Sequence, residues 1–328
     1  MQRPWVCPIC HASIVQMDRF HVCIREGHTF GNIAGFPDLR VNPQGTGNVH
    51  PSIVDRLHAE YPHRSFHAMV HMLYTQLPDM PSALVKRYIL HIETGVFRAR
   101  AILDAIRTDR SPSPDDTFLE VGCGSGAMLL AATERFSRVL GIDIAPHWLL
   151  IAQKRLQEAG RHATFACASA THLPLPDDSV QWIVGQDVLE HVSDPSALLA
   201  EAFRVLAPGG VLFLSTPNRW TLGLEPHVRL WGVGFLPRTW QTRYVRWYRK
   251  MDYRDVQTLH YFAIRHLLRQ TPFREWRIGL PDLPAAHLHR LSRWERMAYP
   301  VYRMTKQWPI VRWGWRTFGP LFYIVCRK

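Results

Sequence analysis

The stretch from Phe118 to Met128 reads F-L-E-V-G-C-G-S-G-A-M, and it decides the fold. An apolar run leads into three glycines at alternate positions, which are Gly122, Gly124 and Gly126. A helix-compatible run, Ala127 to Arg135, follows at once. This order predicts a buried parallel strand, a tight turn and a helix that begins beneath a ligand. Glycine suits a turn whose dihedral angles exclude other residues, or whose backbone must touch the ligand.

The glycine spacing and the preceding acid indicate the type of ligand. A dinucleotide site has the spacing G-x-G-x-x-G, whereas the third glycine here comes one residue early. Glu120 would repel a phosphate, but it suits a ligand that carries an ammonium and a sulfonium. The stretch resembles the first motif of the class I S-adenosylmethionine-dependent methyltransferases. The resemblance implies that Glu120 and the three glycines bind S-adenosylmethionine.

A second predicted strand, Arg138 to Asp143, ends in a carboxylate about twenty residues after the glycines, as in nucleotide-binding folds. Such a carboxylate can accept both ribose hydroxyls, and Ile144 beside it is assigned to the same cofactor site. The alternative is an N-cap role, because Ala145 to Ala159 reads as a helix. Both roles can hold at once.

A third predicted strand, Ala163 to Ala168, leads into C-A-S-A-T-H-L-P-L-P at residues 167–176. This resembles the methyltransferase segment G-D-A-x-x-L-P, which holds the adenine. Ser169 stands where the family usually has aspartate, and Ala170 matches the next position. The same Ala-Ser pair is typical of the 23S rRNA guanine-N1 methyltransferases.

A fourth predicted strand, Val180 to Asp187, is followed by Q-D-V-L-E-H at residues 186–191. Gln186 is assigned to the cofactor. If a helix starts here, Asp187, Glu190 and His191 share one face. A similar constellation binds a divalent ion in some quinone O-methyltransferases. We prefer the interpretation that this segment mainly supports the strand–helix junction. Asp187 and His191 are candidate catalytic residues, with His191 as the base.

A predicted helix at 195–206, the residues A-P-G-G and a fifth strand at 211–218 resemble the last motif of the methyltransferase type 11 branch. A helix at 261–270 and strands at 273–280 and 321–326 complete the sheet, whose last strand is expected to run antiparallel. The fold class is therefore α/β, a Rossmann-like, seven-stranded, doubly wound sheet spanning residues 111–328.

The first forty residues contain a metal-binding pattern, made of Cys7, Cys10, Cys23 and His28. Paired soft ligands at this spacing suit a closed, structural zinc site. His11 and His21 are alternative fourth ligands, and reduced core cysteines are the alternative to metal. The segment resembles the zinc ribbon of the 23S rRNA guanine-N1 methyltransferases.

Residues 41–110 are expected to form a linker and a helical lid. The helices are predicted at 52–60, 65–76 and 82–107, and Tyr61, Tyr74 or a histidine is expected near the acceptor.

The net charge of +12 indicates an anionic partner. Residues 219–250 carry seven Lys or Arg against one acid, and residues 285–328 carry nine against one. These segments, predicted as cap insertions at 219–250 and 281–320, also hold eight of the twelve tryptophans. Such a pattern suits an anionic lipid surface or RNA. It also suits a cap that only packs around substrate.

The sequence predicts an enzyme that methylates a small-molecule or lipid-linked acceptor. The alternatives are an rRNA base methyltransferase and a non-catalytic subunit with the same fold. No stretch approaches the ~20 apolar residues of a membrane span, and six cysteines do not form a disulfide scaffold. A cytoplasmic location with peripheral membrane contact is therefore expected. The acceptor atom and the oligomeric state are left open.

Overall fold

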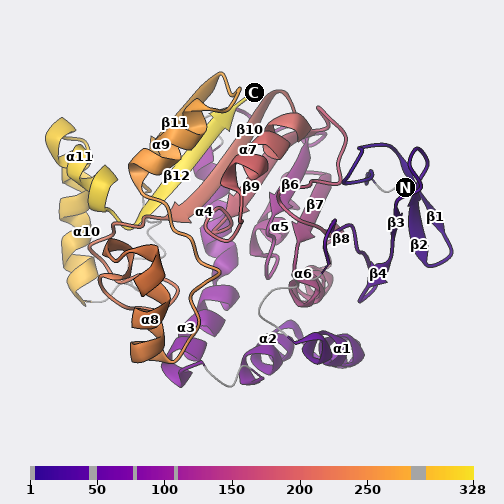
Figure 1. Cartoon of the computed structure of the whole chain (residues 1–328), viewed down its shortest axis with the longest axis horizontal. Helices are drawn as coiled ribbons and strands as arrows, with labels where there is room; N and C mark the ends of the chain where they lie inside the picture. The colour runs from indigo at the N-terminus through magenta and orange to yellow at the C-terminus, as the bar shows by residue number, and fades with distance from the viewer. Residues whose placement is uncertain (1–3, 44–49, 77–79, 107–109, 282–292) are drawn as a thin grey trace.

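The computed structural model describes residues 4–43, 50–76, 80–106, 110–281 and 293–328. Seven strands form the main sheet (Figure 1) in the order β11-β12-β10-β9-β6-β7-β8. Their bounds are β6 Thr117–Val121, β7 Arg138–Asp143, β8 Thr164–Cys167, β9 Val180–Gln186, β10 Leu206–Pro217, β11 Glu275–Gly279 and β12 Leu321–Arg327. β12 pairs antiparallel with both of its neighbours, and the other pairs are parallel. This confirms the predicted class I sheet.

Neighbouring residues of the central strands point to opposite faces of the sheet, and helices cover both faces. Phe118 lies in the core under α4 (Gly95–Ile106), α5 (Ala127–Ala132) and α6 (Pro146–Glu158). Leu119 lies in the core under α7 (Pro195–Val205) and α9 (Tyr261–Arg269). Because both faces are buried, the central strands are mostly apolar rather than alternating between apolar and polar residues.

The helical segment before the sheet contains α1 (Pro51–Glu60), α2 (Phe66–Thr75) and α3 (Ser82–Glu93). The single helix expected at 82–107 is wrong, because the chain breaks at Thr94, and Arg107 lies outside the described residues. Gly95 begins α4 where a Cβ would lie 2.8 Å from Ala127 Cβ, so the break permits close packing on α5.

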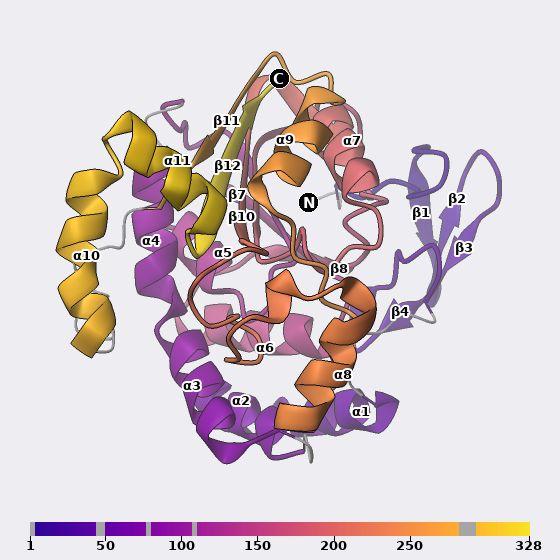
Figure 2. The same cartoon turned by 60° about the vertical axis from the view of Figure 1, so that its left-hand side comes forward.

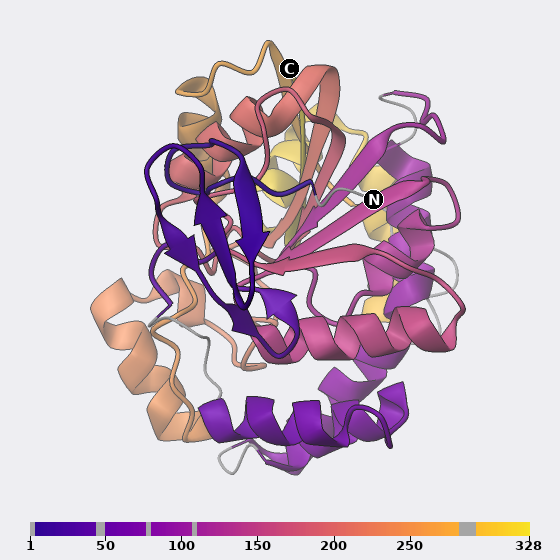
Figure 3. The same ribbon diagram turned by 90° about the vertical axis from the view of Figure 1, so that its right-hand side faces the viewer.

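The helices α1 and α2 pack against α6, on the outside of that helical layer (Figure 3). Tyr61 donates a hydrogen bond to Gln157, and Tyr74 is buried against Tyr88. The hydroxyl of Tyr88, in α3, instead donates to the carbonyl of His227 in the insertion after β10, at 3.0 Å.

The N-terminal segment forms two small antiparallel sheets, β1 (Ile14–Met17) with β2 (Phe20–Cys23) and β3 (Thr29–Phe30), and β4 (Asn32–Ile33) with β5 (Phe36–Pro37). It lies at the β8 edge of the main sheet (Figure 3). The N–H of Leu39 donates to Cys167 O at 2.8 Å, and that of Val6 donates to Pro174 O at 2.9 Å. The apolar core of this segment is continuous with the core beneath α7 and α9.

Two insertions flank the carboxyl end of β10. The first contains η1 (Val233–Phe235) and α8 (Arg238–Arg249), and the second contains α10 (Arg293–Thr305) and α11 (Pro309–Phe318), as Figure 2 shows. The part of the second predicted cap at 282–292 and most of the predicted linker at 42–48 lie outside the described residues. The division at residues 40 and 110 remains a prediction. No helix in the described part of the chain is long and apolar enough to cross a bilayer.

Candidate functional site

The three glycines after β6 have φ angles between 46° and 73°, a region that residues with a side chain rarely adopt. A Cβ at Gly122 would lie 2.4 Å from Val188 Cγ2, and one at Gly126 would lie 2.8 Å from Ala152 Cβ. A Cβ at Gly124 would meet no atom within 4 Å. The turn is therefore packed at both ends, and Gly124 faces open space from which a ligand can approach the backbone.

Asp143 ends β7 beside this turn. Its Oδ2 accepts a hydrogen bond from the N–H of Gly124 at 2.8 Å, and its Oδ1 accepts one from Ala145 at 2.9 Å. The side chain is buried, and burial raises the pKa of Asp143 to about 6. Each carboxylate oxygen keeps a further lone pair. The predicted N-cap role is wrong, because Ala145 is itself the N-cap residue of α6 and that helix has no side-chain cap within the described part of the chain. The remaining lone pairs are compatible with a grip on ribose hydroxyls.

Glu120 lies in β6 with its carboxyl group buried. Its Oε2 has no hydrogen-bond partner in the described part of the protein. Burial raises the pKa of Glu120 well above its usual value. A buried polar atom without a partner costs free energy. A cationic group of a ligand, such as the ammonium of the expected S-adenosylmethionine, would supply that partner.

The ends of β7 and β8 form the side of the site assigned to adenine. Ile144 is 41% exposed, although it directly follows a buried strand. It therefore offers apolar surface to a ring. Ser169 and Ala170 are both half-buried. The hydroxyl of Ser169 lies 2.9 Å from Thr171 Oγ1 and accepts a hydrogen bond from the N–H of Thr171 at 3.2 Å. These two bonds leave the hydroxyl of Ser169 one further position.

Residues 187–191 form a turn, so the suggested helix start is wrong. Asp187 has a φ of 53°, which a right-handed helix cannot continue, and α7 begins only at Pro195. Asp187 is exposed and Gln186 is half-buried at the end of β9. Of the three residues expected on one helical face, only Glu190 and His191 belong to the cluster described next.

That cluster includes a histidine from the insertion after β10, His227. Its Nε2 lies 3.8 Å from Glu190 Oε1, and its ring meets that of His191 edge to face at 5.1 Å. His227 Nδ1 lies 2.6 Å from Glu225 Oε1, and His191 Nδ1 lies 3.1 Å from the carbonyl of Asp255. With Nδ1 of His191 donating to this carbonyl, its Nε2 carries the lone pair, and Nε2 of His227 carries one only when that ring is uncharged. Glu190, His191 and His227 offer ligand atoms within 4.8 Å of one another, a group that could hold a metal ion.

The protonation states within the cluster differ. Burial, followed by the charge of Asp187, raises the pKa of Glu190 to about 8. Burial acts to lower the pKa of His227, but the bond to Glu225 and the nearby carboxylates outweigh it, so the pKa is raised. Burial of the imidazole ring, followed by the charge of His227, lowers the pKa of His191. His191 is therefore the uncharged imidazole near neutral pH, able to accept a proton.

Glu225 and His227 were not among the site residues predicted from the sequence. Their signal was faint: Glu225 is the single acid of the basic stretch 219–250, and a histidine lies two residues after it. Nothing in the spacing of a loop insertion indicates that it returns to the end of β9.

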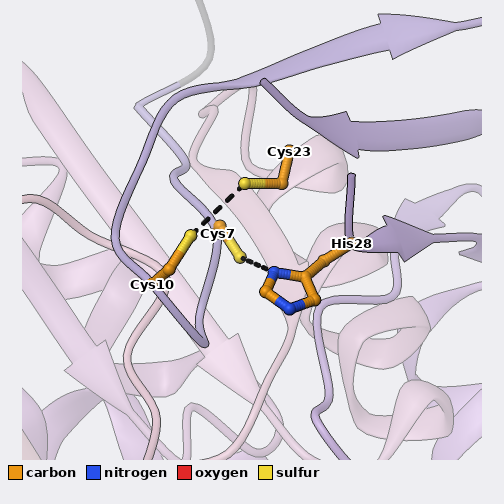
Figure 4. Close-up of side chains that lie close together, drawn as sticks. All are labelled: Cys7, Cys10, Cys23 and His28. Carbon is orange, nitrogen blue, oxygen red and sulfur yellow. Dashed lines mark hydrogen bonds between the residues drawn. The ribbon is translucent and has the colours of Figure 1, made fainter. Parts of the chain in front are cut away.

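The predicted metal ligands of the N-terminal segment converge (Figure 4). Cys7, Cys10, Cys23 and His28 place their ligand atoms within 4.8 Å of one another. Cys10 Sγ lies 3.3 Å from Cys23 Sγ, and Cys7 Sγ lies 3.5 Å from His28 Nδ1. Disulfide sulfurs lie about 2 Å apart, so these are free thiols. Three thiols and an imidazole fit a tetrahedral zinc ion.

The alternative fourth ligand His21 lies outside the cluster of three thiols and His28. Its Nε2 contacts Asn32 Oδ1 at 3.3 Å.

Beyond the cluster, Arg40 is buried and joins the segment to the site described above. It pairs with Asp38 at 2.6 Å, and its Nη1 donates to the carbonyl of Ile144 at 3.3 Å. Arg40 was not among the site residues predicted from the sequence.

Comparison with known proteins adds to this geometry. The family described as "Methyltransferase domain" matches residues 119–214. A malonyl-[acyl-carrier protein] O-methyltransferase from Serratia marcescens is 30% identical over 190 residues, which cover 55% of this chain and 68% of that protein. The chain belongs to the class I S-adenosylmethionine-dependent methyltransferases. The matched region of this methyltransferase runs from β6 to β10 and includes the glycine turn.

A ubiquinone biosynthesis O-methyltransferase from Idiomarina loihiensis is 37% identical to this methyltransferase over 123 residues, which cover 34% of this chain and 49% of that protein. The chain spans about half the length of this and similar curated relatives. A solved structure of Haemonchus contortus phosphoethanolamine N-methyltransferase 2 has a TM-score of 0.47 and 16% identity, covering 69% of this chain and 51% of that one. Likeness at this level carries no information about the substrate.

Proposed function

We propose that this methyltransferase transfers a methyl group from S-adenosylmethionine to a small-molecule or lipid-linked acceptor. The observation that carries the proposal is the open space at Gly124, bordered by Asp143 and by the unpartnered oxygen of Glu120. Asp143 would accept the ribose hydroxyls, and Glu120 would face the ammonium group. Both residues carry carboxyl groups, whereas a dinucleotide site would need hydrogen-bond donors to the phosphates at these positions.

The other residues assigned to the cofactor surround the same space. Ile144 and Ala170 would contact the adenine ring, and Ser169 would accept a hydrogen bond from its amino group. Gln186, at the end of β9, would lie on the methionine side. This arrangement would hold the donor still, so that binding rather than bond-making chemistry is the main contribution of the protein.

In the proposed reaction the acceptor atom forms a bond to the methyl carbon while the bond from that carbon to sulfur breaks. An oxygen or nitrogen acceptor also loses a proton. His191 would take this proton on Nε2, because its Nδ1 is held by the carbonyl of Asp255. His227 and Glu225 would position the ring. Asp187, exposed at the same edge, would contact the acceptor rather than the cofactor.

Two observations support a small or lipid-linked acceptor. The relatives named above are, by their names, enzymes of small or carrier-bound molecules. The helices that flank the carboxyl end of β10 also expose tryptophans, among them Trp240 and Trp313. An rRNA base is the second candidate, favoured by the thiol cluster and by the positive charge of the insertions.

We also propose that Cys7, Cys10, Cys23 and His28 hold a structural zinc ion. Four protein ligands leave no open position, so the ion would stabilise the N-terminal segment without taking part in methyl transfer. The segment is too small to bury a core of its own, and metal binding would contribute its folding free energy.

The test incubates purified protein and methyl-labelled S-adenosylmethionine with two fractions of a cell extract from a deletion strain, one that holds lipids and small molecules and one that holds ribosomal RNA. We expect label in the lipid or small-molecule fraction, and none with the Asp143→Ala variant. Label in ribosomal RNA would select the second candidate. Cofactor binding without transfer to either fraction would support the non-catalytic alternative.

A further inference from the structure

The helices α10 and α11 expose large apolar side chains on their outer side. The exposed set is Met297, Val301, Met304, Trp308, Ile310 and Trp313. On α10 the spacing of four and three residues from Met297 through Val301 to Met304 places these side chains on one face. Trp308 follows in the turn before α11, of which it is the N-cap residue. Ile310, near the start of α11, is 87% exposed. We call this set the α10–α11 face.

The α10–α11 face is not the side by which these helices pack on the protein. Tyr302 donates to the carbonyl of Pro281 at 2.7 Å and meets Trp315 edge to face at 5.0 Å. Trp315 Nε1 donates to Thr305 Oγ1 at 3.1 Å. These contacts join the two helices and hold them to the end of β11. The α10–α11 face lies on the other side of the helices from these contacts. A helix exposed to water usually carries polar residues on that outward side.

Positive charge accompanies the exposed apolar residues. Residues 293–318 contain six Lys or Arg and one acid, Glu295, a net charge of +5. Arg303 and Arg312 are exposed beside the α10–α11 face. Apolar side chains with tryptophan, bordered by arginine, match the boundary of a bilayer, where tails meet anionic headgroups. A nucleic acid would use the arginines but leave the methionines and Ile310 without a role.

The α10–α11 face is fixed close to the acceptor side of the site. Asn218 follows β10 and donates to the carbonyls of Thr317 and Gly319 at 2.9 and 2.8 Å. The carboxyl end of β10 lies next to that of β9, from which Glu190 and His191 follow. A surface that rests on lipid through α10 and α11 would therefore bring the acceptor side to the headgroups.

We propose that the α10–α11 face docks on an anionic phospholipid bilayer, with the apolar side chains in the interface and the arginines on the headgroups. Docking would bring the enzyme to a lipid-linked acceptor, and this biological role rests on the proposed function. Docking itself needs no cofactor, so it can be measured separately from catalysis.

The test measures co-sedimentation of the full chain with phosphatidylcholine vesicles, with and without about a third of phosphatidylglycerol. We expect binding to the anionic vesicles that weakens with added salt. Met304→Asp should weaken it at least about tenfold, because a carboxylate then meets both the acyl boundary and the headgroup charge. Arg303→Glu with Arg312→Glu should remove the preference for anionic lipid.

The matched control is Met17→Asp on β1. Met17 and Met304 are both 59% exposed, and β1 lies at the opposite end of the molecule from α10 (Figure 1). Met17→Asp should bind vesicles like the unaltered protein, and calorimetry with S-adenosylmethionine should show both variants folded and binding cofactor. Equal vesicle binding by Met304→Asp and Met17→Asp would overturn the proposal. So would a dimer that Met304→Asp dissociates in the absence of lipid, or RNA binding that the arginine variants lose while vesicles are not bound.

Discussion

At the residue scale, Asp143 shows how one side chain serves the fold and the proposed site together. Its two oxygens accept the N–H groups of Gly124 and Ala145, which links the glycine turn to the start of α6. The same burial that makes these bonds effective raises the pKa of the carboxyl group to about 6. The charge on this group, and with it the strength of a ribose grip, therefore changes within an accessible pH range.

Cofactor affinity should depend on pH through Asp143. The carboxyl group is ionised above about pH 6 and protonated below it. An ionised acceptor makes the stronger hydrogen bonds, so affinity for S-adenosylmethionine should fall as the pH is lowered from 8 to 5. Asp143→Asn should bind about 100-fold more weakly at pH 8, through loss of charged hydrogen bonds, and show a flat profile. Isothermal titration calorimetry at several pH values measures both. Unchanged affinity in Asp143→Asn would contradict the assignment.

His227 should tune the proposed base. Its positive charge lowers the pKa of His191, so His227→Gln should raise that pKa and move the acid limb of the kcat profile to higher pH. His191→Gln should lower kcat by about 100-fold or more, the usual contribution of a general base, while cofactor affinity stays the same. An acid limb that does not move in His227→Gln would rule out the charge coupling.

At the scale of elements, the glycine turn between β6 and α5 combines two different demands. Gly122 and Gly126 are required by the fold, because a Cβ would collide with Val188 or Ala152. Gly124 has a positive φ but open space around it. Packing thus explains two glycines of the motif, and the proposed approach of a ligand would explain the third.

Substitution of the glycines should separate stability from binding. Gly126→Ala should lower the free energy of unfolding by about 3 kcal/mol or more, from overpacking and an unfavourable φ. Gly124→Ala should cost only about 1 kcal/mol for its φ, yet weaken S-adenosylmethionine binding strongly. Chemical denaturation and calorimetry on both variants give the comparison. Full cofactor affinity in Gly124→Ala would show that no ligand approaches this backbone.

At the scale of the whole molecule, the N-terminal segment is joined to the sheet and to the proposed adenine side. Its backbone bonds to Cys167 and Pro174, and Arg40 reaches the carbonyl of Ile144. The thiol cluster lies behind these contacts. A change in the cluster can therefore act on the cofactor site through Arg40 without touching the ligand.

Elemental analysis should find one zinc ion per chain, and Cys10→Ser should lose it. Loss of zinc should lower the melting temperature and weaken cofactor binding several-fold, because the chain that carries Arg40 is released. Arg40→Met should keep the zinc and show only the weaker binding. A metal-free native protein, or Cys10→Ser protein with unchanged zinc content, would contradict the zinc proposal.

The sequence alone determined the chain order of the seven strands of the main sheet, the glycine turn, Asp143 at the end of β7 and the grouping of Cys7, Cys10, Cys23 and His28. Each depends on residues that are close along the chain, where spacing and residue type set the local backbone. Only the tertiary structure decided that residues 187–191 form a turn, that Glu225 and His227 meet His191, and that Arg40 reaches Ile144. These contacts join segments far apart in the sequence, and they depend on the path of the insertions in space, which no local spacing encodes.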